Sequence, residues 1–317
     1  MKIKKIASFI IPLFFCASLF CEVSLTGFSI TPEIGFLNGK IVENVWYVSS
    51  SFENNAITLS PTHKMSRLDW KINNTNYFGA ETNLIFNEVY KVDFSFKNVP
   101  PSDCGTMEDY DWIKPEKPDY LTNYSRHINH LNSFTQIDFL LGRIFLVDKN
   151  HNISLCPLFG FETQVLSFSG NAGWKTYDSD NWKKIYFGNK TVISYSQAYG
   201  APVFAFAADF NYLKHFESFL KCSAAWAKRL NCIDIHKERN KLFNDRIENV
   251  WKFSLEFCEA FKFLEHHKIG IKGHVSYIPD SYGFTYPSET SKDPDLSSIG
   301  GTSRFLWSYS LVYAWFF

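Results

Sequence analysis

The sequence lacks several features that define common protein classes. Its 32 basic and 32 acidic side chains give a formal net charge of zero, so no long-range field attracts nucleic acid. It contains neither a glycine-rich phosphate-binding loop nor a GxSxG nucleophile motif. Beyond residue 21 no segment has the pattern of a long amphipathic helix, and no repeat, low-complexity tract or linker divides the chain. We therefore expect one domain and no nucleotide site.

Cysteines are scarce once the first 21 residues are set aside. The remaining five are odd in number and include no CxxC pair and no metal-site spacing. These cysteines are Cys104, Cys156, Cys222, Cys232 and Cys258. The sequence thus predicts neither a disulfide framework nor a metal site, and we expect no cofactor.

The N-terminus has the pattern of a secretory signal peptide. Three lysines within the first five residues precede an apolar run from residue 6 to residue 20. This run is interrupted by Pro12 and is short for a membrane-spanning helix. A lipoprotein signal is disfavoured because the bulky Phe20 precedes Cys21. We predict a signal peptide over residues 1–21 and a mature domain over residues 22–317.

Aromatic residues are abundant, at 18% of the chain, although the mean hydropathy is only −0.17. The C-terminal stretch RFLWSYSLVYAWFF explains this, because apolar and polar or small residues alternate along it. Such a period of two is typical of a strand with one apolar face. The same alternation recurs over residues 90–97, 204–212, 251–257 and 269–277. The sequence therefore predicts an all-β protein.

A soluble sandwich and a transmembrane barrel both fit this alternation. The barrel is favoured because aromatic residues crowd the strand ends and charged residues occupy the opposite faces, as a wet lumen tolerates. The chain also closes on an aromatic residue, Phe317. We expect long extracellular loops over residues 48–64, 99–132, 172–190 and 278–301.

Two short motifs contain candidate catalytic groups. In MEDYDW, Asp109 and Asp111 would share one face of an extended chain, with about 7 Å between their Cα atoms. In CIDIH, Asp234 and His236 would likewise share a face. A carboxylate beside an imidazole orients the ring, and two close carboxylates hinder each other's ionisation. On residue type alone, however, solvated loop charge and lumen lining are the more common explanations.

The order of several motifs resembles the omptin family of outer-membrane endopeptidases. ITPEIGFLNGKIVENVWY looks like the family's first strand, and MSRLDWKINN is similar to its LDWK segment. MEDYDW, the downstream YSRH and CIDIH are similar to the family's catalytic stretches. The resemblance implies a ten-stranded antiparallel transmembrane β-barrel that extends above the outer membrane. It also implies that Asp109 and Asp111 face Asp234 and His236 across a groove, with a water activated between them.

The resemblance further implies a binding cleft for peptide or protein substrates at the cell surface. Glu43 matches an acid of the family's S1 pocket, which favours basic residues, and Met107 matches a wall residue. The second S1 acid is replaced by Cys232, so we expect a less strictly basic preference. Ser125 and His127 match further cleft residues.

Lipid contacts depart from the family pattern as well. Val165 and Ala198 stand where the resemblance would place arginines that hold lipopolysaccharide. We expect the lipopolysaccharide site to be missing, and a host lacking ordinary lipopolysaccharide or an enzyme independent of it. Two other functions remain open: a non-catalytic barrel that acts as an adhesin, and a small pore.

Overall fold

The computed structural model describes residues 24–53, 56–148 and 152–317. The predicted signal peptide, residues 1–21, lies outside this range. Within it, no helix is both long and apolar enough to cross a membrane. The strands are β1 (Leu25–Glu53), β2 (Ala56–Phe86), β3 (Tyr90–Val99), β4 (Ser102–Asp111), β5 (Asn123–Arg143), β6 (Phe145–Leu146), β7 (Ile153–Tyr177), β8 (Ile185–Tyr186), β9 (Thr191–Leu213), β10 (Phe216–His236), β11 (Lys241–Leu264), β12 (His267–Tyr286) and β13 (Ser298–Phe316).

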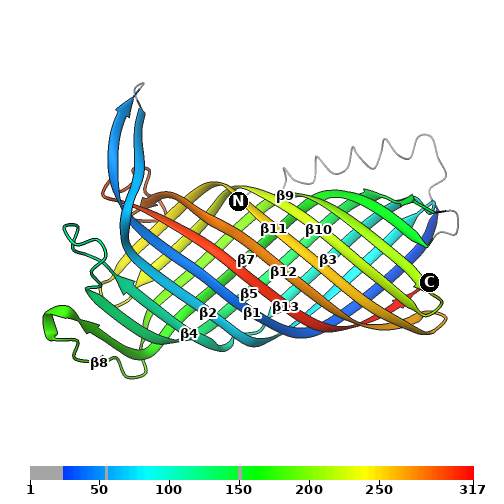
Figure 1. Ribbon diagram of the computed structural model, residues 1–317, viewed down its shortest axis with the longest axis horizontal. Helices are drawn as coiled ribbons and strands as arrows, with labels where there is room; N and C mark the ends of the chain where they lie inside the picture. The colour runs from blue at the N-terminus through cyan, green and yellow to red at the C-terminus, as the bar shows by residue number, and fades with distance from the viewer. Residues whose placement is uncertain (1–23, 54–55, 149–151) are drawn as a thin grey trace.

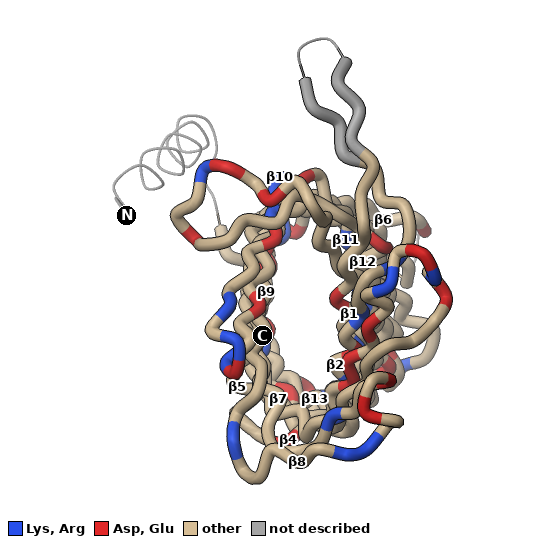
Figure 2. The backbone as a smooth tube through the Cα atoms, turned by 90° about the vertical axis from the view of Figure 1, so that its left-hand side faces the viewer, with Lys and Arg blue, Asp and Glu red and all other residues tan. Residues whose placement is uncertain are grey.

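The strands form one closed antiparallel sheet (Figures 1 and 2). Closure is complete because β1 pairs with β2 on one side and with β13 on the other. Both β3 and β4 lie between β2 and β5, so they are successive parts of one wall strand, interrupted at Pro100 and Pro101. Proline cannot donate to a strand ladder, which explains the break. The two-residue strands β6 and β8 pair with β7 and are not wall strands, so with β3 and β4 counted as one the ring has ten strands, as predicted.

The alternation along β13 confirms the barrel prediction and excludes a sandwich. Arg304, Ser308 and Ser310 are buried inside the ring, whereas Leu311 on the opposite face is 56% exposed. A sandwich would bury the apolar face in a core between two sheets. Here the apolar face points outward, as the lipid-facing side of a membrane barrel must.

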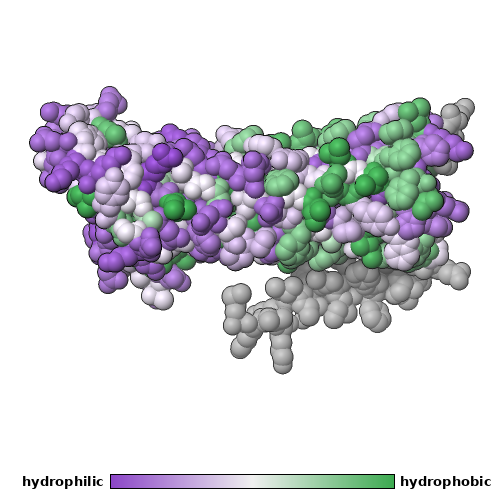
Figure 3. Space-filling view, turned by 90° about the horizontal axis from the view of Figure 1, so that it is seen from below, coloured by the Kyte–Doolittle hydropathy of each residue, from purple (hydrophilic) through white to green (hydrophobic). Residues whose placement is uncertain are grey.

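The barrel is far taller than a membrane. Its strands reach 31 residues, and at about 3.3 Å per residue even strongly tilted strands of this length exceed the roughly 30 Å hydrocarbon layer. Figure 3 shows apolar residues concentrated on the right half of the molecule and hydrophilic residues on the left half. The left half thus projects into water, beyond the membrane.

The prediction of long loops is largely wrong, because the strands continue beyond the membrane into the segments predicted as loops. Most of residues 48–64 belongs to the long hairpin of β1 and β2 that protrudes in Figure 1, and residues 102–111, 123–132 and 278–286 are strand. At the hydrophilic end of the barrel (Figure 3) the outer face of the strands is in water and carries polar residues. In the sequence, these strand segments therefore have the polar composition of loops. Among the described residues of these predicted loops, the connections over residues 112–122, 178–190 and 287–297 lie mainly outside the long strands.

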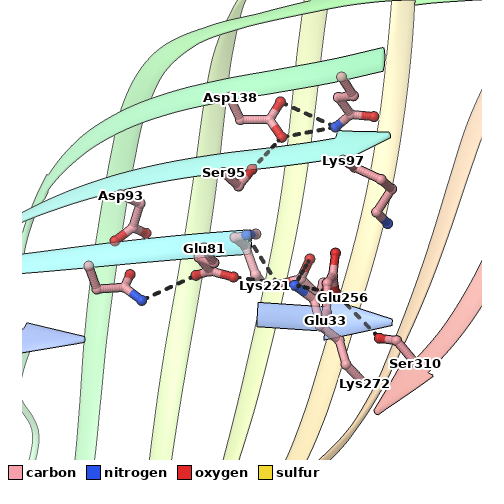
Figure 4. Close-up of polar contacts among 12 residues, drawn as sticks. Glu33, Glu81, Asp93, Ser95, Lys97, Asp138, Lys221, Glu256, Lys272 and Ser310 are labelled. Atoms are coloured by element: carbon pink, nitrogen blue, oxygen red, sulfur yellow. Dashed lines mark hydrogen bonds and ion pairs between the residues drawn. The ribbon is translucent and has the colours of Figure 1, made fainter. Parts of the chain in front are cut away.

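Side chains fill the interior. At the membrane level, Lys272 Nζ lies 3.2 to 3.4 Å from carboxylate oxygens of Glu33, Glu81 and Glu256 (Figure 4). Farther along, the buried indole of Trp70 stacks on Phe168 and Tyr195, with ring centroids 5.6 and 5.7 Å apart. This aromatic stack lies beneath the polar end, where the candidate site is found.

Candidate active site

The polar end of the barrel brings the two predicted motifs together. Asp111 is the last residue of β4, and His236 is the last residue of β10. One cavity is lined by Asp109, Asp111 and His236. A second, adjoining cavity is lined by Asp111, His236 and Asp234. The four predicted catalytic side chains therefore line two cavities that share Asp111 and His236, although they come from strands that are distant in the sequence.

The imidazole of His236 lies between the carboxylate of Asp234 and the guanidinium of Arg239. Its Nε2 lies 2.7 Å from Oδ2 of Asp234, which is only 3% exposed. Its Nδ1 receives a hydrogen bond from the guanidinium of Arg239, in the turn after β10. Phe243 packs edge-on against the ring, at 5.6 Å between centroids. Nothing in the sequence marked Arg239, because a turn arginine is usually solvated surface charge.

The two aspartates of β4 lie in different surroundings. Burial, together with the charges of Asp111 and Asp234, holds the pKa of the Asp109 carboxyl well above its usual range, against the opposing influence of Arg239. Ser66 donates a hydrogen bond to Asp109 at 3.3 Å. Asp111 instead accepts a hydrogen bond from Asn123 Nδ2 at 3.1 Å. The raised pKa favours the protonated form of the Asp109 carboxyl.

Ser125 and His127 form a pair on the wall of the first cavity. His127 Nδ1 donates to the carbonyl of Ala172 at 2.6 Å, so its Nε2 can accept from the Ser125 hydroxyl at 2.9 Å. Burial lowers the pKa of His127, which favours this neutral form. Their partners fix both side chains in place beside the acid couple.

The remaining predicted binding residues fall at different depths. Met107 is buried and lines the first cavity, and Glu43 is buried and lines the second. Cys232 is buried behind these walls, with Gln197 Nε2 3.7 Å from its sulfur. The second cavity also contains Asp245, which the sequence analysis missed. Its inward position on β11 would have been the signal, since a polar residue there faces the lumen.

Across residues 24–53, 56–148 and 152–317, no three histidine, cysteine or acidic side chains are grouped so that they could hold a metal ion. The arrangement instead offers an imidazole, a carboxyl that keeps its proton and a buried carboxylate around a small polar space. These groups are suited to moving a proton to and from a water molecule.

Comparison with solved structures supports the fold. The crystal structure of the outer membrane protease OmpT from Escherichia coli matches with a TM-score of 0.77 and 18% identity, covering 95% of this chain and 100% of that one. Among curated proteins, the outer membrane protease OmpP of Escherichia coli is 24% identical over 80% of this chain and 78% of its own length. The plasminogen activator of Yersinia pestis is 20% identical over 90% of this chain and 86% of its own.

The match also extends to a whole family. The sequence profile of the omptin family aligns with residues 24–305, which is most of the chain. OmpP and OmpT are both named outer membrane proteases, in agreement with the apolar outer face of this barrel. The chain therefore belongs to the omptin family and is a β-barrel of the outer membrane.

Proposed function

We propose that this protein is an endopeptidase of the aspartic type, in which a water molecule is activated between the Asp109–Asp111 couple and the Asp234–His236 dyad. The observation that carries the proposal is the shared cavity: Asp109, Asp111 and His236 line it together, and Asp234 Oδ2 lies 2.7 Å from Nε2 of the His236 ring. The names of the relatives, all of them proteases or a plasminogen activator, support the same activity.

The proposed mechanism uses only side chains of this chain. Arg239 moves away from Nδ1, and His236 accepts a proton from the water as its oxygen attacks the peptide carbonyl carbon. The protonated carboxyl of Asp109 donates a hydrogen bond to the carbonyl oxygen as negative charge develops there. Asp234 holds the imidazolium. His236 then returns the proton to the leaving amide nitrogen, and the carbon–nitrogen bond breaks.

The location of the site indicates its substrates. The cavity lies at the end of the barrel that projects from the membrane, so peptides or proteins outside the cell would reach it. The buried carboxylate of Glu43 in the adjoining cavity favours basic residues near the cut bond. Val165 and Ala198, which pair across β7 and β9, provide no cation for lipopolysaccharide.

A fluorogenic peptide assay on refolded protein tests the proposal. We expect wild type and His215→Ala to cleave alike, because His215 is exposed in the turn between β9 and β10 at the other end of the barrel. His236→Ala should lose activity. Full cleavage by His236→Ala would reject the proposed mechanism, and a lack of cleavage by wild type would favour the non-catalytic adhesin.

A further inference from the structure

Cys232 and Asp245 lie directly opposite each other in the ladder between β10 and β11. Asp245 is only 3% exposed, and its Oδ1 accepts a hydrogen bond from Thr285 at 2.7 Å. The side chain lines the same cavity as Glu43 and His236. A carboxylate is thus present one strand away from the position that Cys232 occupies.

Glu43 provides a second, independent indication that this cavity binds a ligand. It is 2% exposed, and its Oε2 has no hydrogen-bond partner among the residues that the structure describes. The buried acid is aimed into the cavity that it shares with Asp245. Since a buried carboxyl oxygen without a partner is costly, a ligand could provide the donor that Glu43 Oε2 lacks.

The groups that face Asp245 come from every neighbouring strand. Among the described residues no cation forms an ion pair with it, although Arg239 and His236 line the same cavity. They are Glu43 on β1, Asp234 and Cys232 on β10, Thr285 on β12, and Gly300 on β13. Burial, joined by the charge of Asp234, raises the pKa of Asp245 to about 7 despite the hydrogen bond from Thr285. Burial, with Asp234, Asp245 and Asp109 adding to it, raises the pKa of Glu43 well above its usual range. A cation entering the cavity would lower both pKa values.

Gly300 makes room for the acid. A Cβ atom at this position would lie 2.0 Å from Cγ of Asp245 and 2.1 Å from both of its carboxylate oxygens. Any other residue at position 300 would push the carboxylate out of its place. The β13 backbone therefore permits Asp245 to point into the cavity.

We propose that Asp245 is a specificity-determining residue, which with Glu43 binds the basic side chain on the N-terminal side of the cut bond and replaces the acid missing at Cys232. The inference rests on the proposed function for the position of the cut. It revises the expectation that Cys232 weakens the preference for basic residues. Asp245, which pairs with Cys232 from the neighbouring strand, supplies the second acid instead. A guanidinium or ammonium group is the chemistry that two converging carboxylates recognise.

The test compares peptides that carry either arginine or its neutral isostere citrulline before the cut bond. We expect wild type and the control Glu248→Gln to prefer arginine; Glu248 is exposed on β11 and pairs only with Arg229 among the described residues. Asp245→Asn should lower kcat/KM for the arginine peptide about ten- to hundredfold and leave the citrulline peptide unchanged. It keeps an oxygen for Thr285, and heat-modifiable migration on gels checks its folding.

A rescue variant and a binding assay complete the test. Cys232→Asp in the Asp245→Asn background should restore the preference for arginine. An unchanged ratio of arginine to citrulline cleavage in Asp245→Asn would overturn the inference while leaving the peptidase intact. If no peptide is cleaved, calorimetric titration with agmatine decides: loss of binding in Asp245→Asn, with binding kept in Glu248→Gln, supports the cation pocket although the proposed function fails. Equal binding by both variants, or no binding by wild type, overturns it.

Discussion

Nδ1 of His236 is capped by the guanidinium of Arg239 while Nε2 contacts Asp234 at 2.7 Å. The Asp234 carboxylate accepts a hydrogen bond from Nε2–H, so Nδ1 is the nitrogen that remains to take a proton from water. Arg239 occupies that nitrogen from an exposed turn. Asp234 therefore orients His236 as the proposed base, but Arg239 blocks the nitrogen that would take the proton.

Arg239→Ala should uncover the base. Since one hydrogen bond contributes about 0.5 to 1.5 kcal/mol, we expect kcat to rise about two- to tenfold with little change in fold. Steady-state kinetics on a fluorogenic peptide, with Lys237→Ala in the same turn as a control, measures this. A fall in kcat of more than tenfold would show instead that Arg239 stabilises the transition state.

The raised pKa of Asp245 links pH to stability. Its unfolded value is near 3.8 and its folded pKa is about 7, so the folded state binds the extra proton between these values. The stability that this group contributes is complete below pH 3.8 and is lost as the pH rises to 7. We expect Asp245→Asn to flatten that decline, measured as the midpoint of heat modification from pH 4 to pH 8. Parallel curves for wild type and variant would contradict this.

The sequence was sufficient for the wall of the barrel but not for the site. From Arg304 and Phe305 onward, inward-facing and outward-facing residues alternate along β13. This alternation can be read from the local sequence, because successive side chains of any strand point to opposite faces. The meeting of Asp109 with His236 depends on the register of the whole ring, and only the family resemblance suggested it. The inward position of Asp245 can be read from β11 alone, but its placement beside Glu43 and Thr285 depends on the pairing of other strands.

The ion cluster in the lumen should matter for stability. Lys272→Met would leave the carboxylates of Glu33, Glu81 and Glu256 without this shared cation, and breaking such a buried arrangement costs about 3 to 5 kcal/mol. Lys268→Met is the matched control, because Lys268 and Glu217 are both about 30% exposed and their pair contributes about 0 to 1 kcal/mol. Denaturant unfolding in detergent measures the difference. Equal losses in both variants would show that the cluster is not stabilising.

Activity should not require lipopolysaccharide. Val165 is 47% exposed and pairs with Ala198 across β7 and β9, so this part of the outer wall has no cation at either predicted position. We expect protein refolded in detergent alone to reach full activity, within about twofold of protein supplied with lipopolysaccharide. Activation of a hundredfold or more by added lipopolysaccharide would refute the prediction.

A double-mutant cycle on peptide hydrolysis tests the central claim most directly. Asp109→Asn and His236→Ala should each lower kcat by about 10²- to 10⁴-fold, as expected when one proton-transfer group is lost. If both groups act on one water, the double variant should lose no more than the worse single variant. Multiplicative losses in the double variant, or full activity in either single one, would contradict a shared water between the tips of β4 and β10.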